Sequence, residues 1–219
     1  MTNTNPDASP FATRNSEFVI PRAVIFDLGK VMVDFEYAQA GAVIAAKSDL
    51  SCEEIRQVID HTPLLCRYET GSISTKEFFT AVRAAAGYRG TVEEFGRAFA
   101  DVFTVIESSV ELNRALRRRG IPTFVLSNTN ELHLGHIRER FPFYAEFDGY
   151  VLSYEVGAMK PDEKIYLAAE KLTGKRGAEI LFLDDRADNI AAAAARGWQV
   201  IHHQTPEATR ARFEQLGLL

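Results

Sequence analysis

The fold is decided by the stretch Val24-Ile25-Phe26-Asp27-Leu28-Gly29-Lys30-Val31 near the N-terminus. Its apolar first half, rich in β-branched residues, is typical of a strand buried on both faces of a parallel sheet. Asp27 ends this strand and Gly29 follows in a turn. Open α/β sheets bind their ligands at the carboxyl edge, so Asp27 stands where a ligand would bind. A polar residue that only ends a strand would give the same sequence pattern. The rest of the chain has to distinguish a ligand site from a simple strand end.

The composition is that of an ordinary globular protein of 219 residues, with 46% apolar residues, 25% charged residues and a net charge of −5. A chain of this size can bury a proper core. We see no basic stripe with interleaved aromatic residues and no apolar run near the ~20 residues of a membrane span. Cys52 and Cys66 lie in no metal or redox motif. These features predict a cytoplasmic protein that binds neither nucleic acid nor membranes, and they indicate no oligomeric state.

Changes of pattern divide the chain into a tail, a core and an insertion. Residues 1–17 are polar, which predicts a disordered tail. They also lack the apolar segment of a secretory signal. Residues 36–106 carry no convincing strand but contain three capping boxes, each a hydroxyl residue followed three positions later by glutamate. The boxes are Ser51 with Glu54, Ser74 with Glu77, and Thr91 with Glu94. We therefore expect an α-helical insertion at 36–106, with residues 18–35 and 107–219 forming the core.

Strands alternate with helices from residue 108 onward. Strands are predicted at 122–126, 147–152, 179–183 and 198–201, and helices at 111–119, 132–140, 163–171, 191–195 and 207–216. This alternation indicates an α/β fold with a doubly wound, Rossmann-like parallel sheet. Polar residues follow several strands, and the carboxyl ends of parallel strands meet at one edge. They are Asp27, Ser127 with Asn128, and Asp184 with Asp185, and the loop that carries Lys160 opens on the same edge.

Together these residue types suit phosphoryl chemistry. Carboxylate oxygens are hard ligands that suit Mg²⁺, which proteins commonly hold with one or two carboxylates and substrate phosphate. A carboxylate such as Asp27 can serve as a covalent nucleophile toward phosphorus. Lys160 and the hydroxyl of Ser127 can hold the charge on the transferring group. The sheet edge therefore predicts a phosphate site with Mg²⁺ as cofactor.

The same residues resemble the four ordered motifs of the haloacid dehalogenase (HAD) superfamily. The motifs are Asp27-Leu28-Gly29-Lys30-Val31, Ser127-Asn128, Lys160-Pro161, and Asp184-Asp185 with Asn189. The resemblance covers the chain after the tail and implies a subfamily I hydrolase, in which a helical C1 cap is inserted after the first motif. The Phe-Asp-Leu-Gly opening and the Leu-Asp-Asp-Arg-Ala-Asp-Asn run look most like bacterial sugar-1-phosphate phosphatases, such as glucose-1-phosphate phosphatases. The phosphatase domain attached to epoxide hydrolases is a second near relative.

The resemblance implies a nucleophile and a metal shell. Asp27 is expected to attack phosphorus and form an aspartyl-phosphate. Mg²⁺ is expected to be held by Asp27, by the backbone carbonyl of Gly29 and by the carboxylate of Asp185.

It also implies roles for the residues around them. Ser127 and Asn128 are expected to hydrogen-bond the phosphoryl oxygens, and Lys160 is expected to neutralise their charge. Asp184 is expected to orient Lys160 or support the metal, and Asn189 to brace this loop.

One position departs from the family pattern. Phosphatases of this superfamily usually carry an acidic aspartate two residues after the nucleophile, where this chain has Gly29. General acid–base help is typically worth about 10²–10⁴-fold in rate. Three explanations stay open. The leaving group needs little protonation, as with the anomeric oxygen of a sugar 1-phosphate; another acid substitutes, with Asp34 a remote candidate; or the chain does not hydrolyse phosphate esters.

The alternatives are a 2-haloacid dehalogenase-type hydrolase and a catalytically idle HAD-fold binding module. A dehalogenase needs neither acid nor metal, but Asp184 and Asp185 would repel a substrate carboxylate unless a cation intervened. An idle module would not need the nucleophile, the lysine and the metal carboxylates that this chain retains. We therefore expect a Mg²⁺-dependent phosphomonoester hydrolase whose partner is a small phosphorylated metabolite, such as a sugar 1-phosphate.

The insertion is expected to contribute both to substrate contact and to its own core. Tyr37, Arg67 and Tyr68 lie near the hinge and the break at Gly71, and they are candidates for contact with the substrate. Four phenylalanines at helical spacing are instead expected to form the core of the insertion. They are Phe78, Phe79, Phe95 and Phe99.

Overall fold

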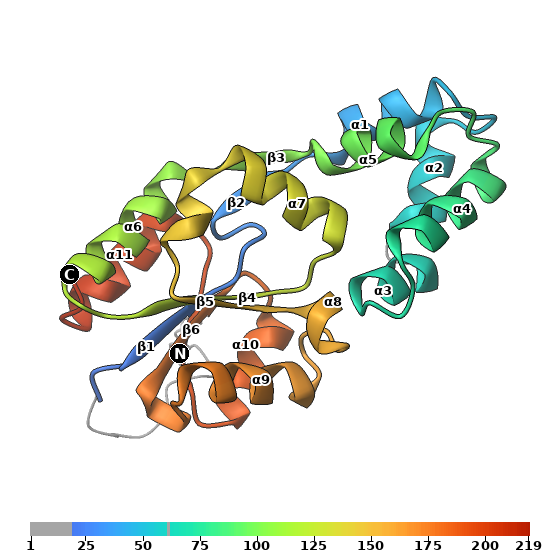
Figure 1. The fold of residues 1–219 in the computed structure, drawn as a ribbon. Coiled ribbons are helices and arrows are strands. Elements are labelled where there is room, and N and C mark those ends of the chain that lie inside the picture. The colour runs from blue at the N-terminus through green and yellow to red at the C-terminus, as the bar shows by residue number, and fades with distance from the viewer. Residues whose placement is uncertain (1–18, 61) are drawn as a thin grey trace, which may run out of the picture.

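A five-stranded parallel sheet, ordered β5-β4-β1-β6-β7, forms the centre of the protein (Figure 1). The computed structural model describes residues 19–60 and 62–219, so the predicted tail at 1–17 lies outside the described residues. The strands of the sheet are β1 (Ala23–Phe26), β4 (Thr123–Ser127), β5 (Gly149–Leu152), β6 (Ile180–Asp184) and β7 (Gln199–His202). Each neighbouring pair is parallel, which confirms the predicted α/β fold class.

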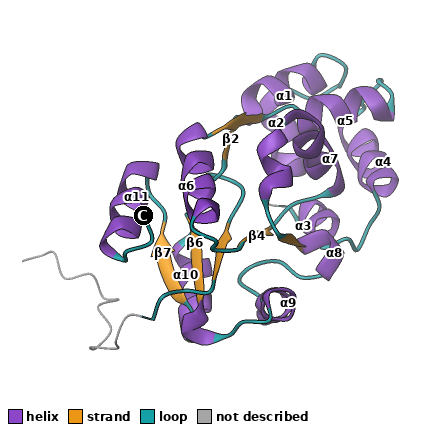
Figure 2. Ribbon diagram, turned by 60° about the vertical axis from the view of Figure 1, so that its left-hand side comes forward, coloured by secondary structure: helices purple, strands orange, loops and turns teal. Residues whose placement is uncertain are grey.

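Helices cover both faces of this sheet (Figures 1 and 2). One face carries α6 (Glu107–Arg118), α7 (Glu131–Arg140) and α11 (Pro206–Gln215), and the other carries α9 (Glu163–Thr173) and α10 (Ala187–Ala195). The side chains of β1 alternate between the two layers: Val24 and Phe26 join the first apolar cluster, and Ala23 and Ile25 join the second. A strand buried on both faces explains why its sequence is continuously apolar.

Most core elements lie within a few residues of their predicted positions. The main shifts are at α6, which begins at Glu107 and not at 111, and at α10, which begins at Ala187 and not at 191. Three short elements had no clear sequence signal because each spans only three to five residues. They are the 3₁₀ helices η1 (Pro142–Glu146) and η2 (Gly177–Glu179), and the helix α8 (Ser153–Val156).

The insertion consists of five helices that share an apolar core of their own. They are α1 (Tyr37–Ala45), α2 (Cys52–Ile59), α3 (Pro63–Glu69), α4 (Thr75–Ala86) and α5 (Val92–Ala100). All three predicted capping boxes are present, at the starts of α2, α4 and α5. The four predicted phenylalanines lie in the core, where they pack with Tyr68 and Tyr88.

The prediction that residues 36–106 contain no strand is wrong at one end. Phe103 follows Phe95 and Phe99 at intervals of four, a spacing that predicts a continued helix, but α5 ends at Ala100. Instead β3 (Phe103–Val105) pairs antiparallel with β2 (Val33–Phe35), so that Phe103 lies opposite Phe35. Three residues are too few to show a period of two, and the pairing with a distant segment decides the structure. This two-stranded ribbon joins the core to the insertion.

Within the described ranges, no helix has the length and apolar character needed to cross a membrane.

Phe95→Ala is expected to lower the free energy of unfolding of the insertion by about 3–5 kcal/mol. Phe95 is fully buried and packs against the rings of Phe78, Phe79, Tyr88 and Phe99. Urea denaturation followed by circular dichroism measures the change, with the exposed Leu167→Ala as control. A loss below about 1 kcal/mol for Phe95→Ala would contradict this packing.

Candidate active site

A buried lysine lies between two aspartates at the carboxyl edge of the sheet. Lys160 Nζ is 2.8 Å from Asp27 Oδ1 and 2.6 Å from Asp184 Oδ2. The side chains of Lys160, Asp184 and Asp27 are 1%, 0% and 11% exposed. Asp27 follows β1, and Asp184 ends β6, the neighbouring strand. Residues from distant parts of the chain therefore form one cluster at the carboxyl edge of the sheet, where the sequence predicts them.

The loop that carries Lys160 is held by Asn128. The Asn128 side-chain amide Nδ2 donates a hydrogen bond to the Lys160 carbonyl at 3.0 Å, and the Lys160 backbone N–H donates to Asn128 Oδ1 at 2.7 Å. The structure thus gives the Asn128 side chain a task other than the predicted contact with phosphoryl oxygens. Ser127 is buried at the end of β4, where its hydroxyl makes one long hydrogen bond of 3.4 Å to the Asn128 carbonyl. The Ser127 hydroxyl is therefore better placed than the Asn128 amide to serve a ligand.

Asp184 is fixed from the opposite side by the first turn of α10. Asn189 Nδ2 donates to Asp184 Oδ1 at 2.9 Å and to Oδ2 at 3.1 Å, and the Arg186 backbone N–H donates to Oδ1 at 2.9 Å. Asn189 thus contacts the carboxylate that pairs with Lys160, and its role as a brace stays a prediction.

Burial acts strongly on Asp27. Burial and the negative charge of Asp184 raise the pKa of this carboxyl, and Lys160 lowers it. The net result is a pKa of about 7. The Leu28 backbone N–H donates to Asp27 Oδ1 at 2.6 Å, the same oxygen that Lys160 contacts. Among the described residues no hydrogen bond reaches Oδ2. One oxygen of Asp27 is therefore anchored, and the other is open to chemistry.

The charges at the site fit a divalent cation. Carboxylate oxygens of Asp27, Asp184 and Asp185 all lie within 4.8 Å of one another. Burial, and then the nearby Asp184 charge, raise the pKa of the half-buried Asp185 carboxyl. Three carboxylates face a single ammonium, and hard oxygen donors at this spacing suit Mg²⁺. Asp27 and Asp185 were predicted as ligands, and the turn that holds the third predicted ligand, the Gly29 carbonyl, follows Asp27 directly.

Asp34 does not replace the acid that is absent at Gly29. Its side chain is 57% exposed and pairs with Lys30, whose hydrogen bond lowers the pKa of the Asp34 carboxyl. A carboxyl that is ionised at neutral pH cannot donate a proton. The space beside Gly29 is instead filled by an aromatic ring, because a Cβ on Gly29 would lie 3.1 Å from Phe35 Cε1.

The three residues proposed to touch substrate from the insertion differ in their surroundings. Tyr68 is buried against Phe78, with ring centroids 4.4 Å apart, and its hydroxyl accepts a hydrogen bond from the Leu132 backbone N–H at 3.2 Å. It therefore joins the insertion to α7. Arg67 is exposed. Tyr37 is half-buried beside Phe35, with ring centroids 5.2 Å apart, and stays a candidate.

Residues 21–197 match a family model described as haloacid dehalogenase-like hydrolase. The chain belongs to this family. The predicted HAD membership, and with it the assignment as an enzyme of hydrolase type, is confirmed.

Named relatives of this HAD hydrolase include two phosphatases. The sesquiterpene phosphatase astK of Aspergillus oryzae is 23% identical over 198 residues, which are 89% of this chain and 96% of the relative. The D-ribitol-5-phosphate phosphatase of Bacteroides thetaiotaomicron is 26% identical over 187 residues, which are 80% of this chain and 88% of the relative. A HAD family enzyme from the same bacterium, crystallised with magnesium and inorganic phosphate, has a TM-score of 0.74 at 21% identity and covers 84% of this chain and 94% of that one.

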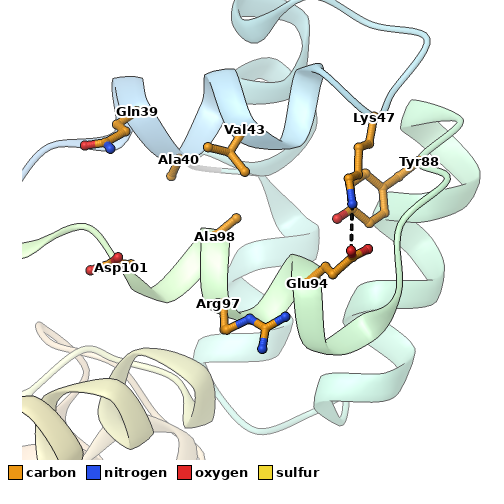
Figure 3. Close-up of a pocket in the computed structure, with 9 residues that line it drawn as sticks. All are labelled: Gln39, Ala40, Val43, Lys47, Tyr88, Glu94, Arg97, Ala98 and Asp101. Carbon is orange, nitrogen blue, oxygen red and sulfur yellow. Dashed lines mark hydrogen bonds and ion pairs between the residues drawn. The ribbon is translucent and has the colours of Figure 1, made fainter.

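A separate groove of about 320 Å³ opens between α1 and α5 (Figure 3). Ala40, Val43 and Ala98 line its apolar part, and at one end Lys47 pairs with Glu94 at 2.7 Å. None of the predicted site residues of the HAD hydrolase lines this groove. It is therefore not the place of the hydrolytic chemistry.

Mg²⁺ is expected to raise the Tm of this HAD hydrolase, because a ligand that binds the folded state stabilises it. Asp185→Asn is expected to weaken Mg²⁺ binding by about 10-fold or more, and so to remove most of that rise. Asp188→Asn is the matched control, since Asp188 lies outside the carboxylate cluster and pairs with Arg186 at 2.8 Å. Differential scanning fluorimetry over a Mg²⁺ titration measures both. An equal Mg²⁺ response in Asp185→Asn and wild type would contradict the assigned site.

Proposed function

We propose that this HAD hydrolase is a Mg²⁺-dependent phosphomonoesterase that acts through a phospho-aspartate at Asp27. The observation that carries the proposal is the buried cluster in which Lys160 contacts Asp27 and Asp184 while Asp185 lies alongside. Such a cluster offers a nucleophile, a fixed positive charge and a set of metal ligands within one small space. The two phosphatases among the relatives, and the neighbour that binds magnesium and phosphate, support the same chemistry.

In the first step Asp27 Oδ2 would attack phosphorus, and the bond between phosphorus and the leaving-group oxygen would break. Oδ2 is assigned because Oδ1 is occupied by Lys160 and the Leu28 backbone N–H. Lys160 and the Ser127 hydroxyl would hold the charge on the phosphoryl oxygens. In the second step water would attack phosphorus, release inorganic phosphate and regenerate the Asp27 carboxylate.

Mg²⁺ would be held by Asp27, Asp185 and the Gly29 carbonyl. When bound, it would supply positive charge that keeps Asp27 ionised and offsets the negative charge of the phosphate. Asp184 would orient Lys160, which contacts its Oδ2, while Asn189 holds the Asp184 carboxylate in place.

The helical insertion at 36–106 would act as a cap over the site. The ribbon of β2 and β3 joins it to the core, and α3 and α5 contact α8 and α7 of the core. α7 and α8 begin shortly after the strand ends that carry the site, so the insertion rests on the rim of that edge. A cap in this position would limit bulk water during phosphoryl transfer.

The substrate would be a small phosphorylated metabolite, with sugar and polyol phosphates as its class. A sugar 1-phosphate fits a site without an acid at Gly29, because its anomeric oxygen leaves more readily than an ordinary alkoxide. Haloacid substrates are disfavoured, since three converging carboxylates would repel the acid group of the substrate. An idle binding module is disfavoured because the nucleophile, lysine and metal ligands lie together.

Asp27→Asn is expected to reduce phosphate release to below about one hundredth of the wild-type rate, because the carboxamide cannot act as the nucleophile. Release is measured from an activated aryl phosphate and from paired sugar 1-phosphates and 6-phosphates, with Mg²⁺ and with chelator. Asp188→Asn is again the control. Wild-type release that does not depend on Mg²⁺, or an Asp27→Asn variant that keeps a tenth of the rate, would contradict the proposal.

A further inference from the structure

The carboxylate of Asp185, a proposed Mg²⁺ ligand, is held differently from that of Asp184. Lys160 and Asn189 both donate hydrogen bonds to the Asp184 carboxylate. Among the described residues, only the backbone N–H of Asp185 itself donates to the Asp185 carboxylate. The direction of the Asp185 side chain therefore depends on how its backbone is held.

The end of β7 holds the peptide unit that precedes Asp185. β7 lies beside β6 in the sheet, with His202 paired opposite Asp184 (Figure 2). The next residue, His203, donates its backbone N–H to the Asp184 carbonyl at 2.9 Å. This contact fixes the plane of the peptide between Asp184 and Asp185.

The His202 side chain holds the peptide unit that follows Asp185. Its Nε2 lies 2.8 Å from the Asp185 carbonyl, and because a carbonyl only accepts, Nε2 is the donor. The N–H of the same peptide unit belongs to Arg186 and donates to Asp184 Oδ1 at 2.9 Å. A trans peptide unit is planar, with its C=O and N–H on opposite edges. These two contacts therefore grip the plane from both sides.

With both flanking planes held, the backbone of Asp185 has no free rotation left. A residue has two soft dihedral angles, φ and ψ, and each one turns one of these planes about the Cα. Fixing both sets the direction of the Cα–Cβ bond of Asp185. The bond then aims the Asp185 carboxylate at the cluster, where its oxygen lies within 4.8 Å of those of Asp27 and Asp184.

His202 is the part of this clamp that can be removed without touching the cluster or the core. Its side chain is exposed, whereas the neighbouring His203 is buried, with Nδ1 2.8 Å from Thr209 Oγ1. Water competes for a hydrogen bond at the surface, so the contact from His202 adds little to overall stability. Its effect falls on the position of Asp185.

We propose that His202 is a positioning residue for the metal ligand Asp185, acting through the hydrogen bond from its Nε2 to the Asp185 carbonyl. This inference rests on the Mg²⁺ site of the proposed function. Without His202, the peptide unit after Asp185 keeps only its Arg186 N–H contact, and the Asp185 carboxylate spreads over more directions. The protein then has to order this ligand when Mg²⁺ binds, which weakens the binding.

The test is a Mg²⁺ titration in the absence of any phosphate ester, read as the rise in Tm by differential scanning fluorimetry. Groups that orient metal ligands typically contribute about 10–100-fold to metal affinity. We expect His202→Ala to raise the Kd for Mg²⁺ by about 10-fold, the lower end of that range. In chelator, His202→Ala should unfold at nearly the wild-type temperature, which a merely structural role would not allow.

Two further variants make the result specific. His202→Gln keeps an N–H donor at a similar reach, so its Kd for Mg²⁺ should lie closer to wild type than that of His202→Ala. Gln204→Ala is the matched control, because Gln204 is also exposed and follows the same strand. It should bind Mg²⁺ as wild type does.

The outcomes separate this inference from the proposed function. A wild-type Kd in His202→Ala, with the Mg²⁺ response lost in Asp185→Asn, would overturn the role of His202 and leave the metal site standing. A lower Tm of His202→Ala in chelator with an unchanged Kd would overturn it as well. If the wild-type protein shows no response to Mg²⁺, the proposed metal site fails and takes this inference with it.

Discussion

The buried ammonium of Lys160 is the interaction on which the rest of the site depends. A charge away from water is costly unless it is paired and hydrogen-bonded. Burial by itself disfavours the ammonium, but Asp27 and Asp184 outweigh it, so the pKa of Lys160 is raised. Lys160 therefore stays charged, and both carboxylates stay within hydrogen-bond reach of it. Breaking a buried pair of this kind typically costs about 3–5 kcal/mol, so the folded core and the catalytic geometry are held by the same contacts.

The contacts around Lys160 spread this constraint over three strand ends. Asn128, next to the end of β4, clamps the lysine loop through two hydrogen bonds. Asn189 holds Asp184 at the end of β6, and the Tyr166 hydroxyl on α9 donates to the Asn189 carbonyl at 3.0 Å. Lys160 does not neutralise all of the negative charge of the carboxylates at the site. The remaining negative charge favours binding of a cation, and a bound cation would in turn favour binding of an anionic substrate.

Strong local signals made much of the fold and of the candidate site predictable from the sequence. The run at β1 is apolar without interruption because both faces are buried, and the helix starts in the insertion carry their own capping residues. Because parallel strands share one carboxyl edge, the sequence alone predicts that Asp27, Lys160 and Asp184 lie together. What stayed hidden depends on distant partners. The strand at Phe103 exists through its pairing with Phe35, and the task of Asn128 through a loop 32 residues away.

The most direct test of the covalent mechanism is to trap the phosphorylated enzyme. Protein mixed with ³²P-labelled acetyl phosphate and Mg²⁺, quenched in acid and digested, would be examined for a labelled peptide by mass spectrometry. We expect one phosphoryl group per chain on Asp27, and hydroxylamine should remove it because it is an acyl phosphate. Phosphate release with no labelled protein, or with label on another residue, would contradict the central role of Asp27.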